Sequence, residues 1–245
     1  AHVSSFEAGR VNSFCSTATW LGDGRLLITG GNTPRGSQFF TGGAPLAGND
    51  TAQLADDRWY ATMITLADGR ALMLGGIDPY TEGMYQNPDQ AIAAGQVSMT
   101  PELYTPGTGW RSLTGASSRL AFGPDTLRAS YPRAWVAPNG EVFGISADQM
   151  WWLDVAGNNG SGALRSAGVF KGVPSNTTPR NVGATNSAVM FAPGRILQLG
   201  GNGGFNGDGF VASDAATVID INSGTPVLPE TARLSAPRRF PSATV

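Results

Sequence analysis

The pattern of apolar and polar positions repeats four times along this chain. Each copy has a strand-like apolar run, a turn that ends in glycine and a second apolar run, and a pair of glycines follows in three copies. The copies cover residues 14–31, 59–76, 131–146 and 186–201. Two strands around a tight turn form a hairpin, and a repeat of this size is typical of propellers and solenoids. The pattern therefore predicts an all-β fold.

The spacing of the turns predicts which all-β fold this is. The turn glycines are Gly24, Gly69, Gly140 and Gly194. They follow one another at steps of 45, 71 and 54 residues. Kelch blades repeat at about 50 residues, with surplus residues in connecting loops. The sequence thus predicts a kelch-type β-propeller built from four-stranded antiparallel blades.

The end of the sequence predicts that this propeller is incomplete. Residues 239–245 resemble the start of the second repeat at residues 60–63, but no turn and no second strand follow. A blade with one strand would leave bare sheet edges, which propellers avoid. Residues 1–245 are therefore expected to form about four blades plus the first strand of a fifth. The remaining blades are expected in missing polypeptide or in a second chain, and a closed four-bladed ring is the alternative.

Composition agrees with this fold and excludes several functions. The chain has 34 glycines, 16 prolines and only 14% charged residues, and the one helix we expect is a short turn around residues 89–94. A net charge of −2 gives no electrostatic footprint for nucleic acid. No apolar run approaches the ~18 residues of a membrane span. The single histidine, His2, precedes the first repeat, so no Ser-His-Asp arrangement is expected.

The single cysteine is the first candidate for chemistry. A lone Cys is ordinarily a small apolar filler. Cys15, however, opens the first strand of one repeat, and Tyr60 stands at the equivalent position of the next. Equivalent positions of successive blades lie side by side around the axis of a propeller. The sulfur and the phenol are therefore predicted to meet at the mouth of the central channel.

These residues carry a resemblance to a known family. Phe14-Cys15, the run at residues 26–31, Arg58-Trp59-Tyr60-Ala61-Thr62 and the run at residues 66–70 resemble the galactose oxidase and glyoxal oxidase group of mononuclear copper radical oxidases. The sequence Arg-Trp-Tyr-Ala-Thr at residues 58–62, together with Tyr131-Pro132, is more similar to the glyoxal oxidase branch than to the galactose oxidase branch. The resemblance covers nearly the whole chain.

The resemblance implies a specific cofactor and reaction. Cys15 and Tyr60 would share a thioether bond, and Tyr60 would bind copper and store one oxidising equivalent as a tyrosyl radical. Such an enzyme oxidises a primary alcohol, an aldehyde or a sugar and reduces dioxygen to hydrogen peroxide. A secreted, periplasmic or cell-surface location is implied. The family's two histidine ligands and second tyrosine lie in later blades, so the remaining ligands are expected outside this chain. The alternative is a relative that has lost copper.

Further site residues are expected on weaker signals. The family shields its radical with a bulky side chain, and Trp151 and Trp152 are candidates, although strand aromatics are usually core. Tyr131, Phe205 and Asn206 fall in segments expected to face the substrate, although residues 203–209 are also readable as a plain flexible loop. Asp56 and Asp57 are expected to orient Arg58 or to be solvated turn charges.

The alternative function belongs to another class of protein. A non-catalytic kelch propeller would bind a protein or a carbohydrate through its loops. Such a protein does not need a cysteine and a tyrosine in register on successive blades. The positions of Cys15 and Tyr60 therefore favour the oxidase.

Overall fold

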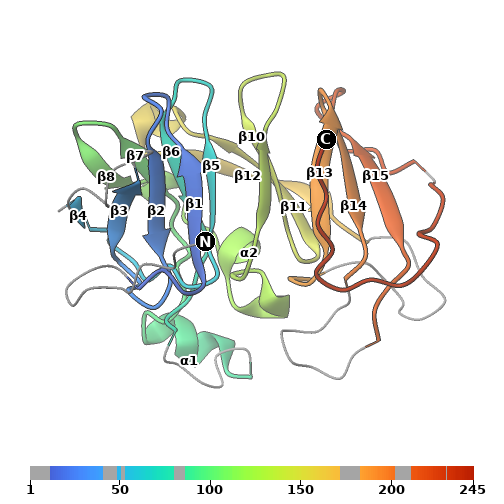
Figure 1. The fold of residues 1–245 in the computed structure, drawn as a ribbon, viewed down its shortest axis with the longest axis horizontal. Helices are drawn as coiled ribbons and strands as arrows, with labels where there is room; N and C mark the ends of the chain where they lie inside the picture. Colours follow the sequence, from blue (N-terminus) through green and yellow to red (C-terminus); the bar gives the residue numbers. More distant parts are fainter. Residues whose placement is uncertain are drawn as a thin grey trace, which may run out of the picture.

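The structure of the chain is a computed structural model. It describes residues 12–40, 49–50, 53–79, 86–171, 183–201, 211–229 and 231–245. Over these residues the chain forms four antiparallel sheets that stand side by side, each built from consecutive segments of the sequence (Figure 1). The prediction of an all-β propeller fold is confirmed.

The first two sheets correspond to the first two repeats. Sheet one contains β1 (Ser16–Trp20), β2 (Leu26–Gly30), β3 (Ser37–Phe40) and β4 (Asn49–Asp50). Sheet two contains β5 (Thr62–Thr65), β6 (Ala71–Leu74), β7 (Glu102–Thr105) and β8 (Gly109–Ser112). In both, the strands pair in sequence order. Register matches as well, because Thr17 lies opposite Thr29 in the first hairpin and the equivalent residues, Thr62 and Leu74, lie opposite each other in the second.

The other two sheets follow the same plan. Sheet three contains β9 (Arg133–Val136), β10 (Val142–Ser146), β11 (Gln149–Asp154) and β12 (Ala163–Val169). Sheet four contains β13 (Ser187–Ala192), β14 (Arg195–Leu199) and β15 (Ala216–Asp220). A single antiparallel bridge between Asp220 and Val227 stands where a fourth strand would lie.

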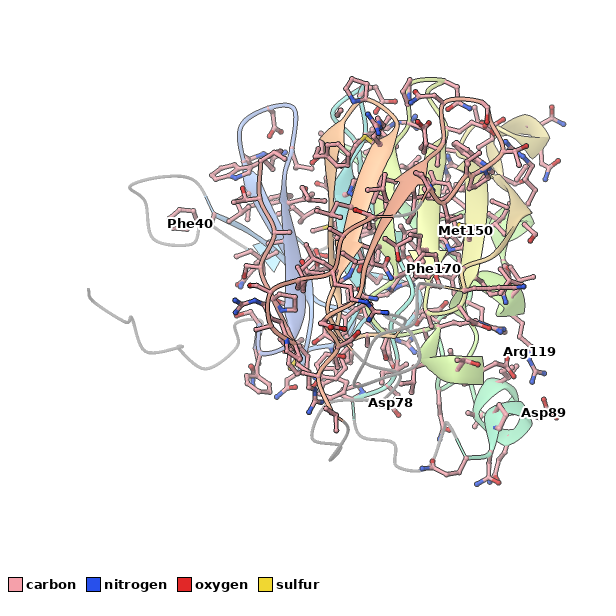
Figure 2. All side chains as sticks on the ribbon, turned by 90° about the vertical axis from the view of Figure 1, so that its right-hand side faces the viewer. Phe40, Asp78, Asp89, Arg119, Met150 and Phe170 are labelled. Atoms are coloured by element: carbon pink, nitrogen blue, oxygen red, sulfur yellow. The ribbon has the colours of Figure 1, made fainter. Side chains whose placement is uncertain are left out.

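The core lies between neighbouring sheets, which pack face to face. Leu27, Phe39 and Met73 belong to the cluster between sheets one and two. Between sheets three and four, Met150 and Phe170 belong to the corresponding cluster (Figure 2). All four residues of β6 are buried, as the continuous apolar run predicted for a strand covered on both faces. Burial between blades therefore explains why the hairpins carry so many apolar positions.

Short helices occupy the end of the sheets away from the hairpin turns. α1 (Pro88–Ala93) confirms the helix expected around residues 89–94, whereas α2 (Arg119–Phe122) was not predicted. Arg119 of α2 pairs with Asp89 of α1 at 2.6 Å, and the two side chains approach each other in Figure 2. Three 3-10 turns lie at Thr114–Ala116, Asp125–Leu127 and Asn158–Gly160.

The four sheets do not close into a ring (Figure 1). The alternative of a closed four-bladed ring is therefore wrong, and the prediction of an incomplete propeller is confirmed. Residues 241–245 form no regular strand in the structure. The physical reason is that a strand needs a paired neighbour, and the backbone pairing next to this segment is a single isolated bridge between Ser213 and Arg238.

Candidate active site

Each of four non-glycine residues at the openings of blades has a left-handed backbone. The φ angle is 61° at Cys15, 58° at Tyr60, 52° at Tyr131 and 47° at Phe240. This conformation costs about 1–2 kcal/mol for an L-residue, so the surroundings must hold it. We call Cys15, Tyr60, Tyr131 and Phe240 the rim residues.

Hydrogen bonds between blades link the rim residues. The N–H of Tyr60 donates to the carbonyl of Cys15 at 3.3 Å, and the N–H of Tyr131 donates to the carbonyl of Tyr60 at 2.8 Å. The N–H of Phe240 donates in the same way to Thr185, which holds the equivalent position of blade four. The predicted equivalence of Cys15 and Tyr60 thus has a structural basis, and Phe240 repeats it in the segment that follows blade four.

The glycine pairs supply the next part of this arrangement. The second glycine of each pair donates its N–H to the carbonyl two residues before the next rim residue, namely Gly31 to Arg58, Gly76 to Ala129 and Gly201 to Arg238. Gly31 has a φ of +82°, and a Cβ there would lie 2.5 Å from the carbonyl oxygen of Phe14. Only glycine allows this close approach of two backbones.

Replacing Gly31 with alanine is expected to lower the free energy of unfolding by about 2–4 kcal/mol, because the new Cβ meets backbone that cannot rotate away. The matched control is Gly24→Ala. Gly24 has the same φ of +82° with nothing within 4 Å of a built Cβ, so only the conformational cost of about 1 kcal/mol remains. Urea denaturation of both variants measures the difference. Equal losses would contradict the close-approach argument.

Side chains of three rim residues meet. Tyr60 is 6% exposed, whereas Cys15 and Tyr131 are half-buried. The Tyr60 side chain also lies near enough to the Cys15 thiol and to the Tyr131 phenol to affect the pKa of both groups. The Tyr60 and Tyr131 rings lie 4.7 Å apart between centroids at 31°. The structure therefore brings together Cys15, Tyr60 and Tyr131, which three different blades contribute.

Burial favours the neutral forms of Cys15 and Tyr131. Burial raises the pKa of the Cys15 thiol, and the Tyr60 side chain opposes that rise. Burial also raises the pKa of the Tyr131 phenol, and the neighbouring Tyr60 and Cys15 raise it further. Both groups therefore carry no charge at neutral pH.

An indole covers the Tyr60 ring. Trp59 stacks on Tyr60 with 3.5 Å between ring centroids and an interplanar angle of 25°. Its Nε1–H donates to Oδ1 of Asn32 at 3.1 Å, and its backbone exchanges two hydrogen bonds with Ile77. Sequence reasoning missed this contact, although Trp59 is the immediate neighbour of Tyr60 in the chain.

Trp151 and Trp152, the predicted shielding residues, lie in the hydrophobic core. Trp151 packs edge-on against Phe122 with 5.1 Å between centroids, and Trp152 packs against Phe143 at the same distance. Both residues belong to β11, two strands out from β9. A strand buried on both faces buries two consecutive side chains, which is the physical reason that this prediction is corrected. The ring stacked on Tyr60 is Trp59 instead.

A buried ion pair anchors the segment before Tyr60. The Arg58 side chain is fully buried, and its Nη2 lies 2.8 Å from Oε1 of Glu102. The guanidinium also donates to the carbonyls of Gly75 and Thr100, both at 2.6 Å. The carboxylate of Glu102 in turn accepts the backbone N–H of Ala55 at 2.9 Å. Arg58 and Glu102 together fix the chain on its way into the site.

The expected partners of Arg58 are corrected in part by this geometry. Asp57 pairs with Arg35 at 2.6 Å rather than with Arg58. Burial raises the pKa of Asp56, and the positive charge of Arg58 partly opposes that rise. Sequence reasoning missed Glu102, the first residue of β7 and the partner of Arg58. Phe205 and Asn206 lie outside the described residues, so their expected substrate-facing role stays a prediction.

The described residues do not by themselves fit a copper centre. No group of three or more His, Cys, Asp and Glu side chains among them is placed to hold a metal ion. The cluster offers two phenol oxygens and a sulfur, whereas copper(II) sites draw on imidazole nitrogen. His2, the single histidine of the sequence, lies outside the described residues. Tyr60 is the one predicted ligand whose side chain the structure places.

Comparison with known proteins places the chain among propellers of one class. No family model matches the sequence. A galactose oxidase of Gibberella zeae is 28% identical over 200 residues, which cover 77% of this chain and 26% of that protein. A fungal alcohol oxidase of the AA5 family, solved in complex with copper, matches 94% of this chain and 44% of its own with a TM-score of 0.70 at 20% identity. YjhT matches with a TM-score of 0.59 at 15% identity and is covered to 67%.

The fold and the matches define a β-propeller of the galactose oxidase type. The chain is similar in sequence to galactose oxidases, and the resemblance to the galactose oxidase and glyoxal oxidase family is confirmed. It spans about a quarter of the length of the curated relatives that it matches. The closer likeness to the glyoxal oxidase branch, and the polypeptide that supplies further blades, stay predictions.

Proposed function

We propose that this chain is part of a copper radical oxidase that oxidises a primary alcohol or an aldehyde and reduces dioxygen to hydrogen peroxide. The observation that carries the proposal is the position of Tyr60 beside Cys15 on the neighbouring blade, where the Tyr60 N–H donates to the Cys15 carbonyl at 3.3 Å. These are the two residues that the family resemblance assigns to a thioether cofactor. The names of its relatives, galactose oxidase and a copper-bound alcohol oxidase, support the same class of enzyme.

The thioether is proposed to form between the Cys15 sulfur and the Tyr60 ring carbon next to the hydroxyl. One C–S bond forms, while the S–H bond and one ring C–H bond break. Two electrons and two protons leave, and dioxygen takes them up as hydrogen peroxide. The backbone hydrogen bond from Tyr60 to Cys15 supports this step, because it holds the two residues side by side.

Tyr60 and Trp59 then have proposed roles in the reaction. Tyr60 is the copper ligand and the radical site, and the remaining ligands come from polypeptide outside residues 1–245. Trp59 takes the shielding role once assigned to Trp151 and Trp152, because its indole covers a face of the Tyr60 ring. A stacked indole keeps water from that face and delocalises charge deficiency on the phenol.

The proposed substrate is a small alcohol, aldehyde or sugar, with dioxygen as co-substrate. An oxidase that releases hydrogen peroxide suits a location outside the cytoplasm, either secreted, periplasmic or at the cell surface. Among the described residues, no helix has the length and apolar character that a bilayer crossing requires.

Peptide mass analysis of copper-loaded, aerated protein tests the proposal. Trypsin should release residues 11–25 and 59–70 as one cross-linked species. Its mass should be lower by two hydrogens than the sum of the two separate peptides. It should also resist reducing agents, because these cleave a disulfide but not a thioether. Cys15→Ser is the control and should release the two peptides separately. Unlinked peptides from wild-type protein that binds copper would contradict the proposal and favour the alternative, a propeller that binds a protein or a carbohydrate.

A further inference from the structure

Asn32 contacts the two residues that precede Cys15 and Tyr60 in the chain. Its backbone N–H donates to the carbonyl of Phe14 at 3.0 Å, and its side-chain Oδ1 accepts the indole Nε1–H of Trp59 at 3.1 Å. Phe14 directly precedes Cys15, and Trp59 directly precedes Tyr60. One residue of blade one therefore connects the chain segments that lead into the candidate site.

The backbone contact of Asn32 belongs to the repeat, whereas its side-chain contact does not. Ile77 stands at the equivalent position of blade two, directly after the glycine pair. Its N–H donates to the carbonyl of Trp59 at 3.0 Å, just as the N–H of Asn32 donates to Phe14. An apolar residue thus serves the fold at this position, so the fold alone does not require the amide of Asn32.

The stack of Trp59 on Tyr60 needs an unusual backbone, because consecutive side chains of an extended chain point in opposite directions. The left-handed φ of 58° at Tyr60 breaks this alternation, and the two rings lie 3.5 Å apart between centroids. The two hydrogen bonds with Ile77 hold the backbone of Trp59. They leave the indole free to rotate about its χ2 angle, which has a broad distribution in tryptophan.

The apolar contacts of Trp59 do not by themselves fix the orientation of its indole. Trp59 is half-buried and packs against the cluster that contains Ile77, Val97 and Ala129. Such contacts are non-directional, whereas a hydrogen bond depends on the angle at its donor. The Oδ1 atom of Asn32 accepts the single N–H donor of the indole. This bond therefore selects one orientation of the Trp59 ring.

We propose that Asn32 is a positioning residue that holds the Trp59 indole over the Tyr60 ring. Its side-chain carbonyl acts on Tyr60 only through Trp59, and its backbone N–H ties the same contact to the residue before Cys15. The inference rests on the proposed function, in which Trp59 shields the radical site. The orientation of the indole itself does not depend on copper.

Variants of Asn32 separate the side-chain hydrogen bond from the fold. Asn32→Ile removes the acceptor and introduces the residue type that blade two has at this position. Asn32→Ala also lacks the acceptor and takes the place of Asn32→Ile if the larger side chain prevents folding. Asn32→Asp keeps a side-chain oxygen as acceptor. The matched control is Ser37→Ala, because Oγ of Ser37 accepts the indole N–H of Trp110 at 2.9 Å.

The test uses the full chain, prepared without copper and labelled with isotope-enriched tryptophan and 3-fluorotyrosine. Single Trp→Phe and Tyr→Phe variants assign the signals of the six tryptophans and five tyrosines. In Asn32→Ile, we expect the Trp59 indole N–H to exchange with solvent about fivefold faster, the factor for one lost hydrogen bond. The fluorine signal of Tyr60 should move, because the stacked indole no longer has a fixed position. Asn32→Asp should restore the slow exchange.

Ser37→Ala should speed the exchange of the Trp110 indole N–H by a similar factor and leave the Tyr60 signal in place. An unchanged exchange rate of the Trp59 indole in Asn32→Ile would overturn the inference. Faster exchange with an unmoved Tyr60 signal would overturn it as well, because the hydrogen bond would then anchor Trp59 without positioning it over Tyr60.

Copper-loaded, aerated protein separates this inference from the proposed function. Asn32→Ile should still form the cross-link between Cys15 and Tyr60, but its tyrosyl radical absorption should decay about fivefold faster than in the wild type. Wild-type protein that binds copper but never cross-links would overturn the proposed function alone, because the exchange and fluorine results are obtained without copper.

Discussion

Replacing Cys15 with serine is expected to abolish most peroxide production while the fold stays intact. Serine cannot form the thioether, so Tyr60 keeps the properties of an ordinary phenol. The fold should lose only about 1 kcal/mol, because Cys15 is half-buried and serine is nearly the same size. A peroxide assay with copper-loaded protein and a urea denaturation curve measure the two effects.

Tyr60→Phe is the companion variant, because it keeps the ring and removes the hydroxyl that the oxidase needs. It should lose activity as fully as Cys15→Ser does. Full peroxide production by the Cys15→Ser variant would contradict the oxidase hypothesis. The alternative, a propeller that binds a protein or a carbohydrate, would then be favoured.

Replacing Glu102 with glutamine is expected to lower the free energy of unfolding by about 3–5 kcal/mol. The Arg58 and Glu102 side chains are 0% and 2% exposed, and removal of one partner leaves a buried charge without compensation. Because Arg58 precedes Trp59 and Tyr60 directly, the variant should also disturb the stacked rings. Urea denaturation measures the loss of stability, and fluorine NMR of protein labelled with 3-fluorotyrosine reports on the surroundings of the Tyr60 ring.

Asp57→Asn serves as the control for the buried pair. It breaks the ion pair with Arg35, whose side chain is 52% exposed, and such surface pairs contribute about 0–1 kcal/mol. The double variant Arg58→Met with Glu102→Leu should recover part of the stability, because both charges then disappear together. A loss in Glu102→Gln no larger than that in Asp57→Asn would contradict the argument.

The sequence was sufficient to predict the blades because their determinants are local. Turn glycines, apolar runs and glycine pairs act within a single hairpin, and α1 begins at a proline, which suits the first turn of a helix. The neighbourhood of Cys15 and Tyr60 was also predictable, since equivalent positions of successive blades must lie side by side. Because the blades repeat, the long-range contact between Cys15 and Tyr60 could be predicted from their spacing in the sequence.

Contacts between residues that do not hold equivalent positions in the repeats could not be predicted from the sequence spacing. Glu102 lies 44 residues from Arg58, and Asn32 lies 27 residues from Trp59. Nothing local distinguishes these partners from other polar residues. Trp151 and Trp152 misled for the opposite reason, because two adjacent aromatics look exceptional in the sequence although a doubly covered strand readily buries both.

The hydrogen bonds among the rim residues have a consequence for how the protein matures. Tyr60 belongs to blade two, but its conformation depends on Cys15 of blade one and Tyr131 of blade three. No isolated blade therefore contains the cluster, which comes into being only at the junctions of three docked blades. Cross-linking would then follow folding and could not precede it. A newly made chain with a misplaced blade would keep a free thiol, and that thiol would mark the misfolded molecules.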